Sequence, residues 1–144
     1  MGTDLEAGFL ENAQERLMQQ PFSALLNAEI TAVRSNYCEL RVPSRHDLQQ
    51  QHGFLHGGVV SYAADNALTI AGFLAMRQAV VTSEFKINYV RPAIGDAIIA
   101  RAECIFAGKS QAVSRCEVFA VIDGEEKLCA LAQGTIALLS KPGA

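Results

Sequence analysis

The sequence lacks tryptophan and any strongly basic stretch, and it carries a formal net charge of only −3 over its 144 residues. A chain without a basic patch has little to bind a phosphate backbone, so we expect no nucleic-acid partner. Hydrophobic residues make up 50% of the chain, which excludes a long disordered region and supplies one core. We therefore expect residues 1–144 to form a single domain.

The chain also lacks a Cys-x-x-Cys pair. Its four cysteines stand apart in apolar, strand-like runs: Cys38, Cys104, Cys116 and Cys129. Such spacing favours buried free thiols in a reducing cytosol over a disulfide framework. Three histidines share one loop without the fixed spacing of a zinc site, namely His46, His52 and His56, so we expect no metal.

A targeting segment is missing as well. The first twenty residues begin acidic and polar and have no apolar core, unlike a secretory signal. No apolar run reaches the length of about 18 residues that spans a bilayer. We therefore expect a cytoplasmic protein without a membrane partner.

Periodicity predicts the elements. Apolar residues at helical spacing predict an amphipathic helix over residues 4–19, with Thr3 as its cap. A short helical turn over 22–26 and strands over 28–34 and 37–42 follow, and a polar loop covers 43–54.

The segment from Gly57 to Met76 is long, rich in alanine and apolar nearly all round, which predicts a buried helix. Its polar exceptions recur every four residues as one stripe: Ser61, Asp65 and Thr69. Four strands are expected after it, over 79–91, 96–107, 111–122 and 127–139, and short turns suggest an antiparallel meander. A strongly curved sheet wrapped around the helix would cover it, giving an α+β fold.

Two features of this helix carry chemistry. His56-Gly57-Gly58 stands at its start, where unpaired N–H groups can hold an anion or an oxyanion, although the glycines could also serve only a tight turn. Asp65 is a carboxylate in an apolar helix, so it must be paired with a structural partner or functional. The two are separated by roughly 12 Å of helix rise, too far for one carbonyl to touch both. If they act together, they must come from two subunits of a symmetric dimer.

The segment QQQHGFLHGGVVSYAADNA resembles the PaaI-type acyl-CoA thioesterases of the hotdog superfamily, whose pattern is Asn or Gln, five residues, His-Gly-Gly and an Asp on the following helix. The element order is similar from about residue 28 to 139. The resemblance implies a hotdog fold, a curved antiparallel sheet around one long central helix, and hydrolysis of an acyl-CoA thioester to a carboxylic acid and free CoA. It implies no cofactor, since CoA is part of the substrate, and a homodimer with shared active sites. Dimer and tetramer both remain open.

The resemblance also implies roles for individual residues. Gln50 would polarise the thioester or position water, although many members have Asn there. The Gly57 N–H would hold the thioester oxygen, with His56 shaping that end of the helix. Asp65 of the partner subunit would be the general base or the nucleophile, and Ser83 would orient the attacking water.

The same resemblance places CoA contacts in two further segments. The residues it implies for substrate binding are Gly58, Val90, Arg91, Pro92, Gly95, Gly108, Lys109 and Ser110. Arg91 and Lys109 suit phosphates, and the glycines allow close approach of the backbone. Each cation taken alone is equally explained as a solvated turn residue.

Other functions remain open on this fold. An acyl-thioester hydratase or dehydratase would need a histidine and an acidic residue in motifs that are not found here. A non-catalytic acyl-CoA-binding module would bind substrate without releasing thiol. Several apolar residues could line an acyl tunnel, but core packing explains them as well: Leu55, Val59, Tyr62, Leu68 and Phe85.

Overall fold

A computed structural model describes residues 4–139. In chain order the elements are α1 (Asp4–Met18), α2 (Pro21–Leu25), β1 (Glu29–Arg34), β2 (Tyr37–Pro43), the 3-10 turn η1 (His46–Leu48), α3 (Gly57–Met76), β3 (Val80–Tyr89), β4 (Ala97–Ala107), β5 (Gln111–Ile122) and β6 (Glu125–Leu138). The expected helices and strands are present, with ends shifted by at most two residues. Thr3, the expected cap of α1, lies outside the described residues.

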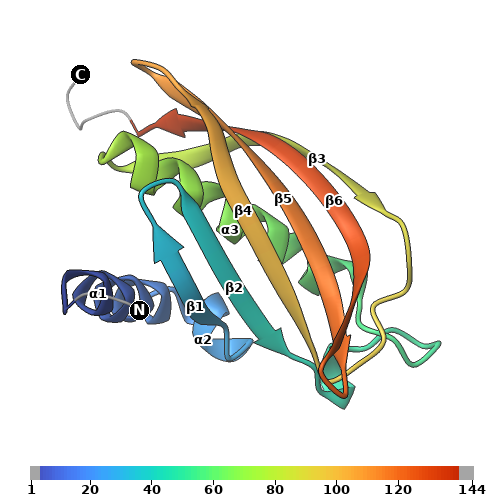
Figure 1. The fold of residues 1–144 in the computed structure, drawn as a ribbon. Helices are drawn as coiled ribbons and strands as arrows, with labels where there is room; N and C mark the ends of the chain where they lie inside the picture. The colour runs from blue at the N-terminus through green and yellow to red at the C-terminus, as the bar shows by residue number, and fades with distance from the viewer. Residues whose placement is uncertain (1–3, 140–144) are drawn as a thin grey trace.

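Six strands form one antiparallel sheet in the order β1-β2-β4-β5-β6-β3. The sheet curves around α3, which lies along its concave side (Figure 1). Inner and outer side chains alternate along β2, where Cys38, Leu40 and Val42 are buried. The expected α+β architecture of the hotdog type is confirmed.

The expected four-stranded meander is wrong in one strand. β4, β5 and β6 are consecutive neighbours, but β3 pairs with β6 at the sheet edge, while β4 pairs with β2. Residues 90–96 cross from β3 to β4, and this segment is longer than the usual two- to five-residue hairpin loop. Alternation marks a segment as a strand but does not identify its neighbour.

One face of α3 packs on the sheet through small side chains such as Ala63, Ala67 and Ala71. Gly72 allows a close approach of α3 to β6, since a Cβ there would stand 3.0 Å from Ile136. The expectation that no apolar run reaches membrane-spanning length is wrong for α3, which is long and apolar enough by composition, although more than half of its apolar window is buried inside the protein. The expectation of burial on nearly every side is wrong, because the face that bears Asp65 is half-exposed.

All four cysteines are free and buried, as expected. Desolvation raises the pKa of the Cys38 thiol, and it raises that of Cys116 to about 12 and that of Cys129 to about 11. These thiols are therefore neutral at physiological pH and serve as small core side chains.

The two edges of the sheet differ. At β1, Gln14 of α1 accepts a hydrogen bond from the Ile30 N–H over 2.7 Å and donates one to the Ala28 carbonyl over 3.2 Å. This side-chain amide occupies the edge as a neighbouring strand would. The outer edge of β3 is not paired with any strand in the described part of the chain, so it is open to another chain.

Candidate active site

The first turn of α3 holds one free backbone donor. His56 is the N-cap, and its Nδ1 accepts the Gly58 N–H over 2.8 Å. The N–H groups of Val59 and Val60 bond to the His56 carbonyl. Within residues 4–139 the Gly57 N–H has no acceptor. At the positive end of the helix dipole it is therefore available to a substrate oxygen.

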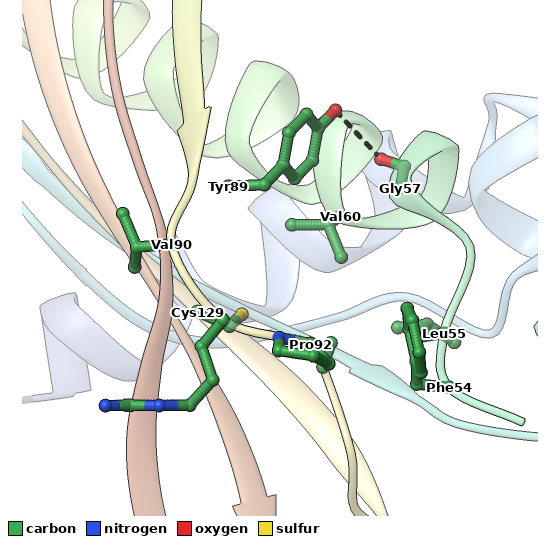
Figure 2. A pocket seen from close by; sticks show the side chains of 10 residues that line it. Phe54, Leu55, Gly57, Val60, Tyr89, Val90, Pro92 and Cys129 are labelled. Carbon is green, nitrogen blue, oxygen red and sulfur yellow. Dashed lines mark hydrogen bonds between the residues drawn. The ribbon is translucent and has the colours of Figure 1, made fainter. Parts of the chain in front are cut away.

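A pocket of about 330 Å³ lies beside Gly57 (Figure 2). Its lining comes from the loop before α3, the start of α3, the last residue of β3, the segment after β3 and one residue of β6: Phe54, Leu55, Gly57, Val60, Tyr89, Val90, Arg91, Pro92, Ala93 and Cys129. The Tyr89 hydroxyl donates a hydrogen bond to the Gly57 carbonyl over 3.2 Å, so its ring stands over the helix start. The structure thus brings three predicted CoA contacts, Val90, Arg91 and Pro92, to the predicted oxyanion donor.

The side chains of Arg91 and Gln50 each form a hydrogen bond within the chain. The Arg91 guanidinium is exposed and donates to the Leu128 carbonyl over 2.9 Å, which fixes its place at the rim of the pocket. Gln50 is half-buried, and its side-chain oxygen accepts the His52 N–H of its own loop. In this conformation Gln50 supports the loop before α3 and does not line the pocket.

Asp65 lies in a second cluster, between α3 and β3. Its Oδ1 accepts a hydrogen bond from the Thr82 hydroxyl over 2.7 Å. The Thr69 hydroxyl lies 2.7 Å from that of Thr82 and donates to the Asp65 carbonyl over 2.8 Å. The carboxylate is half-exposed, and no described residue donates to its Oδ2. One oxygen is thus held by the protein and the other is free.

Ser83 stands next to this cluster without joining it. The pairing of β3 with β6 shifts register between Thr82 and Glu84, so Ser83 is the extra residue of a β-bulge. Its side chain is exposed, whereas Thr82 points inward to Asp65. Any contact of Ser83 with an attacking water would be made at the open edge of β3.

Two glycines that the sequence analysis proposed as CoA contacts, Gly95 and Gly108, lie in different parts of the fold. Gly95 has φ +150°, and a Cβ there would stand 2.1 Å from the Val121 carbonyl, so close approach to β5 requires glycine. Gly108, Lys109 and Ser110 form the β4–β5 turn, where the Ser110 carbonyl accepts the Leu138 N–H. Leu138 pairs with Val80, so this turn lies at the start of β3, while Tyr89 and the Gly57 pocket lie at its end.

One chain therefore contains two separate halves of the predicted site. One half lies at the C-terminal end of β3 and contains Gln50, His56, Gly57 and residues 90–92. The other half contains Asp65, which is hydrogen-bonded to Thr82 near the N-terminal end of β3. In residues 4–139 no group of three or more His, Cys, Asp or Glu side chains could hold a metal ion.

Comparison with known proteins assigns the family. The sequence profile of the Thioesterase superfamily matches residues 52–127, more than half of the chain. The chain belongs to the thioesterase superfamily. A thioesterase family protein from Silicibacter pomeroyi is 38% identical in sequence, with a TM-score of 0.83 over 88% of this chain and 95% of that one.

Two further relatives support the subgroup. A variant of the phenylacetic acid degradation protein PaaI from Thermus thermophilus is 30% identical, with a TM-score of 0.73 over 83% of this chain and 100% of that chain. A 1,4-dihydroxy-2-naphthoyl-CoA hydrolase from Listeria monocytogenes is 27% identical over 81% of this chain and 94% of the relative. This thioesterase is thus a thioester hydrolase of the PaaI-type hotdog group.

Sequence reasoning missed three polar residues of this thioesterase site. Thr69 was identified only as part of a polar stripe, yet its four-residue spacing from Asp65 already placed it on the same helix face. Thr82 was missed because a bulge cannot be read from alternation alone. Tyr89 had no sequence signal, since its contact with Gly57 spans 32 residues.

Proposed function

We propose that this thioesterase hydrolyses acyl-CoA to a carboxylic acid and free CoA at two active sites shared across a homodimer. The observation that carries the proposal is the separation of a free oxyanion donor, Gly57, from a half-satisfied carboxylate, Asp65, on one helix whose neighbouring strand has an open edge.

The open edge suggests how the halves meet. β3 is ten residues long, and most of its side chains are exposed. Antiparallel pairing with a second copy about the middle of the strand would place Val80 opposite Tyr89 of the partner subunit. Because Asp65 lies toward Val80 and Gly57 touches Tyr89, each carboxylate would approach the oxyanion donor of the other chain.

The chemistry follows from the groups present. The Gly57 N–H would stabilise the negative charge that develops on the thioester oxygen. The free Oδ2 of Asp65 would deprotonate a water or attack the carbonyl carbon directly, with Ser83 orienting the water. Breaking the carbon–sulfur bond then releases the CoA thiolate. Where Asp65 itself attacks, water hydrolyses the resulting acyl-aspartate anhydride to the carboxylic acid and restores the carboxylate. No cofactor takes part in this reaction.

The CoA moiety would lie along the Gly57 pocket. Val90, Arg91 and Pro92 line this pocket, and the exposed Arg91 would meet a phosphate of CoA. The β4–β5 turn of the partner subunit, with Lys109, would add the second cation across the open edge.

Thiol release from a panel of acyl-CoAs, followed with a thiol reagent, tests the activity. Asp65→Ala is expected to abolish turnover while sedimentation still shows a folded dimer. Near-normal hydrolysis by this variant would overturn the mechanism. Binding of acyl-CoA without thiol release by the wild type would instead indicate a binding module, and loss of enoyl absorbance without free thiol would indicate a hydratase.

A further inference from the structure

A second groove, of about 520 Å³, separates α1 from α3. From α1 it is lined by Ala13, Arg16 and Leu17, and from α3 by Thr69, Ile70, Phe73 and Arg77. Its floor is apolar, since Leu17, Ile30 and Leu74 are buried there. The two helices thus form the walls of a channel instead of packing together.

One end of this groove begins at the Asp65 cluster. Thr69 lines the groove and its hydroxyl contacts Thr82, which holds the Asp65 carboxylate. From Thr69 to Arg77 the helix rises roughly 12 Å. A thioester whose carbonyl lies at Asp65 could therefore extend its acyl chain along the groove toward Arg77.

Two arginines line the groove beyond Thr69, one near Phe73 and one at the end of α3. The Cζ atom of Arg16 in α1 lies over the Phe73 ring of α3, 5.6 Å from its centroid, and the Cζ atom of Arg77, which caps α3, lies over the Phe9 ring of α1, 5.2 Å from its centroid. Neither guanidinium has a carboxylate partner in the described part of the chain, and the described groove lining contains no Asp or Glu. A guanidinium over a ring face still has N–H donors that can form hydrogen bonds with a carboxylate.

The backbone at Arg77 gives a second, independent indication. Arg77 is the residue that ends α3, and it has φ +59°, a left-handed conformation usually taken by glycine or asparagine. An arginine held in this conformation places a charged side chain at the groove where a glycine would fit the backbone better.

We propose that this groove binds the acyl chain and that Arg16 and Arg77 select acyl groups that end in a carboxylate. The substrates would be CoA monothioesters of dicarboxylic acids, with the apolar chain on Leu17 and Ile70 and the distal carboxylate at the two guanidinium groups. This inference rests on the proposed thioesterase function and adds its substrate class.

The test compares pairs of substrates with equal carbon number, long enough to reach from Asp65 toward the arginines: suberoyl-CoA with octanoyl-CoA, sebacoyl-CoA with decanoyl-CoA and dodecanedioyl-CoA with dodecanoyl-CoA. At least one dicarboxylic member is expected to show a kcat/KM roughly tenfold above its neutral counterpart, because charge-assisted hydrogen bonds from arginine are strong. Equal or lower values for all three dicarboxylic members would overturn the inference. Absence of thiol release from every substrate would instead overturn the proposed function.

Arg77→Gly is the sharpest variant, since glycine suits the left-handed backbone and should keep α3 folded. It is expected to raise KM for the preferred dicarboxylic substrate roughly tenfold, with little change in kcat or in KM for the neutral one. Arg16→Lys, which keeps the charge, should lose less selectivity than Arg16→Gln.

Arg34→Gln is the matched control. Arg34 is also an exposed arginine, with its Cζ atom 4.5 Å from the centroid of the Tyr37 ring, but it lies on β1 and does not line the groove. It should leave both KM values unchanged. If Arg77→Gly raises both KM values alike, or if Arg34→Gln has the same effect as Arg77→Gly, the two groove arginines do not recognise the acyl carboxylate.

Discussion

The Thr82 hydroxyl donates a hydrogen bond to Oδ1 of Asp65 over 2.7 Å, linking the edge strand β3 to the central helix α3. This contact fixes the direction of the one carboxylate that the proposed chemistry requires. Because Thr82 precedes a β-bulge, its inward position depends on the bulge as well as on the strand.

Thr82→Val tests this contact. The variant keeps the shape of the side chain and removes the hydroxyl, so the carboxylate loses a hydrogen bond that contributes about 1.5–3 kcal/mol for a charged acceptor. We expect kcat to fall about 10- to 100-fold with little change in KM, as measured by thiol release. Thr135→Val is the matched control, because Thr135 bonds only to the exposed Glu84 on the neighbouring strand. Equal losses in both variants would show that Thr82 acts through the stability of the sheet.

Gly57→Pro tests the oxyanion donor. Proline is favoured at the first residue of a helix, and His56 has the extended conformation, φ −60° and ψ 137°, that a following proline requires. The variant should fold normally and lack only the N–H, which lowers kcat by about 10²–10³-fold. Gly57→Ala keeps the N–H and its Cβ would stand 3.5 Å from Tyr89, an ordinary contact, so it should remain active. Unchanged kcat in Gly57→Pro would rule out this donor.

Mixing two inactive proteins tests the sharing of sites. Asp65→Asn and Gly57→Pro should each be inactive alone, but a mixed dimer contains one site with both native groups. After subunit exchange at equal concentrations, half of the dimers are mixed and each has one working site of two, so about a quarter of the wild-type activity should return. If activity does not return although mass spectrometry detects mixed dimers, both groups act within one chain.

A surface ion pair predicts a pH-dependent contribution to stability. Arg101 of β4 donates to both carboxylate oxygens of Glu126 of β6, over 2.6 and 2.8 Å, and this bond lowers the Glu126 pKa. The stabilisation is therefore present above the carboxyl's unfolded pKa and is lost as pH falls through its lower folded pKa. Because the pair is partly exposed, Glu126→Gln should lower the free energy of unfolding by at most about 1 kcal/mol near pH 7. Urea unfolding at neutral and acid pH should show the difference between wild type and variant shrinking in acid.

Much of the fold could be predicted from the sequence, because periodicity reports burial directly. The alternation of apolar and polar residues predicted strand β2, and the alanine-rich apolar run predicted helix α3. The spacing between Gly57 and Asp65 predicted that the two residues cannot act together within one chain. The neighbour of β3 could not be predicted, since pairing depends on how residues 90–96 cross the sheet. For the same reason Thr82 and Tyr89 were missed, since a bulge and a long-range contact leave no local pattern.

The Gln14 amide on the edge of β1 bears on how far association can proceed. A sheet with two bare edges can add copies at both sides without limit and grow into a filament, whereas a sheet with one bare edge stops after a single addition. In residues 4–139, α1 covers one edge and β3 leaves the other free. We therefore expect α1 to limit association through the sheet to one added copy, and removal of α1 to open the β1 edge to a further copy.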